Sequence, residues 1–336
     1  SAYPGIEPFI LGLDLDGMSE PTSLVSEDYR DFTSYNIAIY TRGQLFYEEL
    51  RYIVGDETMH RILRTFYDRW KFKHVDEEAF KAVAEEVSGR DLSTFFAQWL
   101  HDVVLYDYAV GRVNRRRTAD GKWQTKVEVL RKAPGRIPVE VAAISGTDTA
   151  VVRATGLAER EWVTLETAGE PRTIVIDPRV RTHDWNMLNN TRQLGFQPLS
   201  LLVGTAARPD LYLDTYLSKP VRRDRTTLGL APALWYNDVG GLTVGLRERT
   251  DYLGRFEQNQ LLVAAGTGAA NPAGLPDRKD VDFDLRLRNP VWLRSPGMSQ
   301  TLDAFSVEGR VGARLGIDKA TRAHLGFGPT RTVGAS

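Results

Sequence analysis

Two tyrosines, Tyr35 and Tyr40, stand five residues apart at the start of a helical pattern, and their phenols can donate hydrogen bonds. A phenol with its ordinary pKa of about 10 stays neutral and can donate to negative charge that develops in a reaction. Tyr40 lies where the helix is expected to begin, so its hydroxyl can point outward from a rigid scaffold, as a catalytic donor requires. The alternative is an aromatic side chain packed under its neighbours.

The sequence contains no recognisable set of metal ligands. The five histidines are His60, His74, His101, His183 and His324, and no two lie four residues apart, the spacing that places two imidazoles on one helical face. Asp14-Leu-Asp16-Gly17 has the beginning of a calcium loop but lacks the further ligands of an EF-hand, so a tight turn is expected. We predict no metal site in this chain.

The helix that follows Tyr40 is indicated by apolar residues at three- and four-residue steps. Gly55 is expected to end it, and Asp56 to cap the next helix. The residues of the buried face are Gly43, Phe46, Tyr47, Leu50, Ile53 and Val54.

Three more helices are expected between Asp56 and His101. Asp76 is predicted as an N-cap and Gly89 as a helix stop, with Asp91 capping the last helix. Adjacent glutamates point apart on a helix, so the pairs Glu48-Glu49, Glu77-Glu78 and Glu85-Glu86 are interpreted as solvated faces.

From Asp102 the hydrophobic period changes to two, which is typical of strands. Asp120-Gly121 predicts a hairpin turn, and Arg115-Arg116-Arg117 is expected to protect a solvated sheet edge. Short strands with regular turn signals favour an antiparallel β-sandwich of about seven strands up to Asn190.

Beyond Asn190 the strands become longer and strictly alternating, as in Val281–Arg288 and Val307–Asp318. One face is apolar and the other charged or glycine, which favours a partial antiparallel β-barrel-like region of the outer-membrane type. A soluble antiparallel sheet with one wet face is the alternative. No closing strand is identified before Gly334-Ala-Ser336.

Composition limits the function classes. A chain of 336 residues exceeds the usual size of one domain, and a net charge of −1 argues against a nucleic-acid binder. There are no cysteines, and no run approaches the ~20 apolar residues of a membrane helix. The chain opens without an initiator Met or a signal peptide, and we expect a piece of a longer protein.

Several short motifs in residues 35–101 together resemble the aminopeptidase N family of gluzincin zinc metallopeptidases, in the segment just downstream of the zinc site. The resemblance extends more loosely to Asn190, where Asp184-Trp-Asn186 and Asn189-Asn190 are similar to the end of a β-domain in such proteins. The family's His-Glu-x-x-His signature is absent from this chain. The matching elements are Tyr40-Thr-Arg-Gly43, Leu50–Gly55, Tyr67-Asp-Arg-Trp70, Phe72-Lys-His74, Phe80, Ser88-Gly89, Asp91-Leu92, Phe95-Phe96 and Trp99-Leu100.

The resemblance implies peptide-bond hydrolysis, with zinc, its ligands and the general base upstream in the full-length parent. It places Tyr40 as the hydroxyl that stabilises the oxyanion, with Tyr35 as a weaker substrate-binding candidate. This chain alone is expected to be inactive, and the parent to act on peptides in the cell envelope, in the periplasm or at the outer membrane.

The expected architecture is multidomain α+β. Residues 1–101 are the helical part of the catalytic domain, 102–190 the β-sandwich, and 191–336 the barrel-like region, through which the protein associates with the outer membrane. Two other functions stay open: a catalytically inactive peptidase-like scaffold, or an outer-membrane β-barrel protein with a soluble interaction module.

Overall fold

The computed structural model describes residues 6–146, 148–195, 209–214, 222–237, 241–254, 256, 258–269, 281–290, 298–322 and 330–335. Part of the region expected to be barrel-like therefore lies outside the described residues. The chain consists of two compact units, residues 1–206 and 207–336. The division of the first unit at residue 101 stays a prediction.

A long helical run carries Tyr40. It consists of α2 (Phe32–Asn36), the π-helical turn η2 (Ile37–Arg42) and α3 (Gly43–Val54), and the residues that join these three segments keep right-handed helical angles. The expected helix start at Tyr40 is therefore wrong. Asp31 is the N-cap, and its side chain accepts a hydrogen bond from the amide of Ser34. The helix therefore begins at Phe32, eight residues before Tyr40.

The other helices of the first unit are α1 (Ile6–Leu15), α4 (Asp56–Trp70), α5 (Glu77–Ser88) and α6 (Ser93–Phe96), with π-helical η3 (Ala97–His101) and two short 3-10 turns, η1 (Ser26–Asp28) and η4 (Met187–Asn189). The N-cap at Asp76 is confirmed by a hydrogen bond from Ala79 N to Asp76 Oδ1 of 2.9 Å. Asp56 is not a cap: Gly55 occupies that position, and Asp56 pairs with Arg51 instead.

Seven strands follow and form two sheets, as expected for the sandwich. One sheet has the order β1 (Tyr108–Arg117), β2 (Trp123–Arg131), β5 (Arg160–Thr167); the other has the order β4 (Asp148–Ala154), β3 (Val139–Ser145), β6 (Thr173–Ile176), β7 (Thr191–Gln193). All pairings in these sheets are antiparallel. Strand β1 is an edge strand, and the exposed arginines 115–117 lie on it, as predicted.

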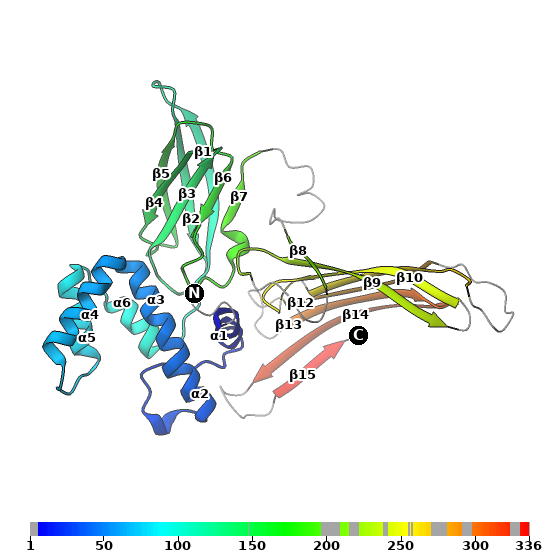
Figure 1. The fold of residues 1–336 in the computed structure, drawn as a ribbon, viewed down its shortest axis with the longest axis horizontal. Helices are drawn as coiled ribbons and strands as arrows, with labels where there is room; N and C mark the ends of the chain where they lie inside the picture. The colour runs from blue at the N-terminus through cyan, green and yellow to red at the C-terminus, as the bar shows by residue number, and fades with distance from the viewer. Residues whose placement is uncertain are drawn as a thin grey trace. The chain divides into compact units, whose positions relative to one another are not determined.

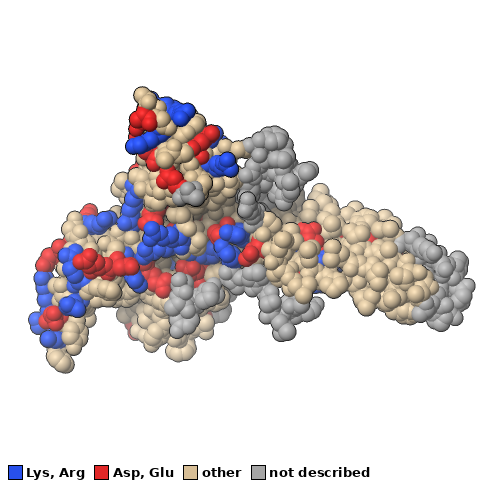
Figure 2. All heavy atoms as spheres, turned by 45° about the horizontal axis from the view of Figure 1, so that its top comes forward, with Lys and Arg blue, Asp and Glu red and all other residues tan. Residues whose placement is uncertain are grey.

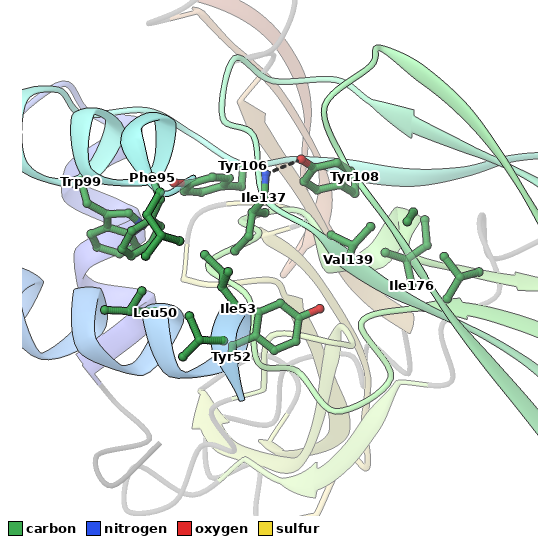
Figure 3. Packing of buried hydrophobic residues seen from close by; sticks show 14 of the residues in the cluster. Leu50, Tyr52, Ile53, Phe95, Trp99, Tyr106, Tyr108, Ile137, Val139 and Ile176 are labelled. Carbon is green, nitrogen blue, oxygen red and sulfur yellow. Dashed lines mark hydrogen bonds between the residues drawn. The ribbon is translucent and has the colours of Figure 1, made fainter. Parts of the chain in front are cut away.

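One hydrophobic core joins the helices to both sheets of the first unit (Figure 3). Leu50 and Trp99 contribute from the helices, Val127 from one sheet, and Val139 from the other, and each is buried. Tyr52 crosses this boundary with its hydroxyl, which accepts a hydrogen bond of 3.0 Å from the amide of Glu140. Burial of apolar surface from both parts therefore stabilises them together.

The second unit contains one eight-stranded sheet in sequence order (Figure 1). Strands β9 to β15 pair antiparallel, which confirms the antiparallel arrangement expected for this region. Strand β8 differs from the expectation, because it pairs parallel with β9. In the described residues β8 and β15 are the edges, and no pairing closes the sheet. The strands are β8 (Asp210–Leu213), β9 (Thr227–Asn237), β10 (Gly241–Asp251), β11 (Gln258–Gly266), β12 (Val281–Pro290), β13 (Met298–Val307), β14 (Arg310–Arg322) and β15 (Thr330–Ala335).

Two details of this sheet differ from the expectation. Val307–Asp318 is not one strand, because Glu308 and Gly309 form the hairpin turn between β13 and β14, both with positive φ of 50° and 79°. Positive φ at both central residues is the geometry of a type I′ turn. Asn-Gly is a typical sequence for such a turn and Glu-Gly is not, so the sequence did not indicate it. Strand β15 was not predicted, yet it pairs with β14. None of the described helices has the length and apolar character of a membrane-crossing segment.

Candidate functional site

Tyr40 presents its side chain to solvent from the middle of the π-helical turn. It is 67% exposed, whereas Ala38 and Arg42 in the same turn are 1% and 3% exposed. Two buried residues therefore anchor the turn on one side, and the phenol projects on another. A π-helical turn inside an α-helix is rare and is often found at functional sites.

Beneath the turn, Arg42 forms a buried ion pair with Asp14 of α1. The distance from Arg42 Nη1 to Asp14 Oδ1 is 2.7 Å, and the two side chains are 3% and 1% exposed. The guanidinium also lies over the ring of Trp99, 5.4 Å from its centroid. These contacts fix the inner side of the turn to two other helical segments.

Two more polar residues complete this buried cluster, which we call the Asp14 cluster: Asp14, Arg42, Glu49 and His183. His183 Nε2 lies 3.3 Å from Asp14 Oδ2, and its backbone amide donates to Glu49 Oε1 at 3.4 Å. Glu49 and His183 are 3% and 4% exposed. The cluster thus joins α1, η2 and α3 to the segment that follows β6.

Charge balance within the Asp14 cluster favours ionised Asp14. Burial alone would raise the pKa of this carboxyl, but the charge of Arg42 and the hydrogen bond from His183 outweigh burial, and the pKa is lowered. Nearby, burial raises the pKa of Tyr106 well above its ordinary value. The cluster is closed to solvent, so it positions the helical turn rather than contacting a substrate.

Tyr35, the second tyrosine of the sequence prediction, is half-buried. Its ring meets Tyr29 edge to face, with centroids 5.4 Å apart, and stacks on Phe32 at 6.4 Å. No observation tests whether Tyr35 contacts a substrate, so that role stays a prediction.

Sequence reasoning missed the Asp14 cluster. Asp14 was expected in a tight turn but lies in α1, because the turn begins only at Asp16. Glu49 was expected on a solvated face and is buried. A signal was present: Ala38, Arg42 and Glu49 continue the apolar spacing of Leu45, Phe46 and Leu50, so two charges fall on the buried stripe.

Among the described residues there is no group of three or more histidine, aspartate or glutamate side chains that could hold a metal ion.

Comparison with known proteins gives little beyond these observations. No family model matches the chain, and no curated protein matches it. Among solved structures, it is similar to aminopeptidase A of Legionella pneumophila in complex with aspartic acid, with 15% identity and a TM-score of 0.34. That likeness covers 43% of this chain and only 17% of the aminopeptidase. The chain therefore has a weak structural neighbour among the aminopeptidases, and a likeness of this size establishes no family.

Proposed function

We propose that the first unit is part of a zinc-dependent peptidase in which the Tyr40 hydroxyl stabilises the oxyanion of peptide-bond hydrolysis. The observation that carries the proposal is the exposed phenol on a turn whose inner side is held by the buried Asp14–Arg42 pair. The sequence resemblance of Tyr40-Thr-Arg-Gly43 to the aminopeptidase N family supports the same role.

The chemical role of Tyr40 follows from its surroundings. Its side chain is open to solvent, so a substrate carbonyl can approach the hydroxyl. A neutral phenol donates one hydrogen bond, and it stabilises the transition state most where the carbonyl oxygen has become negative. When bound in the parent protein, zinc supplies the activated water, and its ligands and the general base are expected outside this chain.

The test is Tyr40→Phe in the full-length parent protein, assayed for peptide hydrolysis. Loss of one oxyanion donor lowers kcat by a factor of about 10²–10³ with little change in KM. Tyr67→Phe is the matched control, because Tyr67 is 64% exposed on α4 and has no proposed role. Equal activity of wild type and Tyr40→Phe, with both folded, overturns the assignment.

A parent protein that hydrolyses no peptide with Tyr40 intact would favour the inactive scaffold instead. Tyr35→Phe in the same assay tests the weaker prediction: a substrate contact raises KM, whereas a purely structural aromatic leaves KM unchanged and retains its ring packing.

A further inference from the structure

The eight-stranded sheet of the second unit has two chemically different faces. Because side chains alternate along a strand, cross-strand partners share a face. Val263 pairs with Leu246 on one side and Phe283 on the other, while Leu262, its neighbour, pairs with Arg247 and Asp284. We call the side that carries Val263 the apolar face and the side that carries Arg247 the polar face.

The apolar face is mainly aliphatic over seven adjacent strands, with the aromatic side chains of Phe283 and Tyr236 among them, and it is open to solvent. Val311 is 79% exposed, Leu234 68% and Leu315 66%. Register places the following on it: Leu211 and Leu213 (β8), Leu228, Leu230, Pro232 and Leu234 (β9), Leu242, Val244 and Leu246 (β10), Leu261, Val263 and Ala265 (β11), Val281, Phe283, Leu285 and Leu287 (β12), Leu302 and Ala304 (β13), and Val311, Ala313, Leu315 and Ile317 (β14).

Polar side chains on the apolar face gather toward one end of the strands. Glu248, Thr250, Asn259, Asn289, Gln300 and Lys319 lie toward this end, whereas Ser306 and Tyr236 lie toward the other. Strand β9 departs from this arrangement, since Leu230, opposite Glu248, is apolar. A band of aliphatic side chains bordered by polar ones on one side is the pattern of a hydrocarbon layer that meets headgroups.

The polar face carries the charges. Arg247 pairs with Asp214 at 3.0 Å, Arg286 with Asp284 at 2.7 Å, and a hollow of about 300 Å³ on this side is lined by both Arg286 and Asp214. In Figure 2 the surface of the second unit that faces the viewer carries few charged residues. Apart from Glu248 and Lys319, the charged side chains of β8–β14 thus lie on one side of the sheet.

All regular elements in the described part of residues 207–336 are strands, so no helix among them covers the apolar face. Protein interfaces carry about one hydrogen bond per 100–200 Å² and are enriched in Tyr, Trp and Arg. On β8–β14 the apolar face carries one tyrosine, Tyr236, and no tryptophan or arginine. Lipid acyl chains require only apolar contact, and the six long strands β9–β14 have 9 to 13 residues, close to the 9–11 that cross a bilayer.

We propose that the apolar face of β8–β14 contacts the acyl chains of a lipid bilayer, with the polar face turned away from lipid. Backbone groups at a sheet edge need partners in hydrocarbon. In the bilayer the edges β8 and β15 therefore pair with further strands. The proposal concerns residues 207–336 and is independent of any peptidase activity.

The absence of cysteine allows a direct test, because single cysteines can be introduced and labelled without background. Leu315→Cys and Arg314→Cys are adjacent, both exposed, and lie on opposite faces of β14. Each variant of the 336-residue chain is labelled with bimane and reconstituted into phosphatidylcholine vesicles, with and without bromine on the acyl chains. Val244→Cys, also exposed on the apolar face, serves as a second variant if the first does not fold.

Brominated acyl chains are expected to quench bimane at 315 and 244 several-fold more than at 314. Equal lipid quenching at 314 and 315 overturns the proposal. Quenching of the label at 315 by aqueous iodide also overturns the proposal, because it indicates that this face is in water. A label at 315 that neither reagent quenches overturns it as well, because it indicates that protein or a second copy covers the face. Peptide hydrolysis is not measured, so failure here leaves the role of Tyr40 untouched.

Discussion

Arg42 and Asp14 illustrate how a residue that never meets solvent can decide the position of one that does. Replacing Arg42 by Met leaves the Asp14 carboxylate buried without its cation, which we expect to lower the free energy of unfolding by about 3–5 kcal/mol. The exposed pair Arg51–Asp56 is the control, because its side chains are 50% and 58% exposed. Arg51→Met is expected to change the free energy of unfolding far less than Arg42→Met does, because water screens exposed ion pairs.

Urea unfolding of both variants measures the difference. Similar costs for Arg42→Met and Arg51→Met would contradict the importance of the buried pair. The double variant Arg42→Met with Asp14→Leu, which removes both charges, should recover part of the loss, since the uncompensated carboxylate is then gone.

Two elements distant in sequence, strand β1 and the segment before η4, are joined by a buried carboxyl. Asp184 is 1% exposed and accepts hydrogen bonds from Tyr108 N at 3.0 Å, Asn186 N at 2.9 Å and Asn190 Nδ2 at 3.1 Å. Burial, together with the neighbouring Asp107 carboxyl, raises the pKa of Asp184 to about 7 despite these donors. The protonated carboxyl is therefore favoured in the folded state.

The sign of the pH dependence follows. A raised folded-state pKa means that the native state binds more protons than the unfolded chain, so stability from Asp184 is full below pH ~4 and is lost as pH rises toward 7. Asp184→Asn should remove this slope, at most about 1.4 kcal/mol per pH unit, although Asn also weakens the hydrogen bonds. Urea unfolding of both proteins from pH 4 to 8 measures it; parallel curves would contradict the prediction.

Sequence motifs predicted helix caps and turns correctly where the residues act on their immediate neighbours in the chain. Asp76 capped its helix and Asp120-Gly121 turned its hairpin, because each acts through its own neighbours. Tyr40 was assigned to a helix start because Asp31, the actual cap, precedes a stretch without a clear apolar repeat. Long-range partners were beyond reach: Asp14 and His183 meet across 169 residues, and nothing between them in the sequence indicates it.

On the scale of the whole molecule, the chain consists of two compact units, and compact units commonly unfold cooperatively. Leu50, fully buried in the first unit, should on replacement by Ala cost about 2–5 kcal/mol. Calorimetry of the full chain is expected to show two transitions, with Leu50→Ala lowering the Tm of one.

The reciprocal variant identifies the other transition. Tyr252 is 1% exposed, and its hydroxyl donates to the carbonyl of Arg223 at 2.9 Å within the second unit. Tyr252→Ala should lower the second Tm and leave the first in place. A single transition that moves with either substitution would mean that the units unfold together.

The two-sided sheet also limits how its strands can change in length. Within β12, deleting one residue reverses the parity of every position beyond it, so that Asp284 and Arg286 would exchange sides with Leu285 and Leu287. Deleting two residues restores the order and only shortens the strand. Viable length variants of β9–β14 should therefore differ by even numbers within strands, while odd insertions should occur only in the turns.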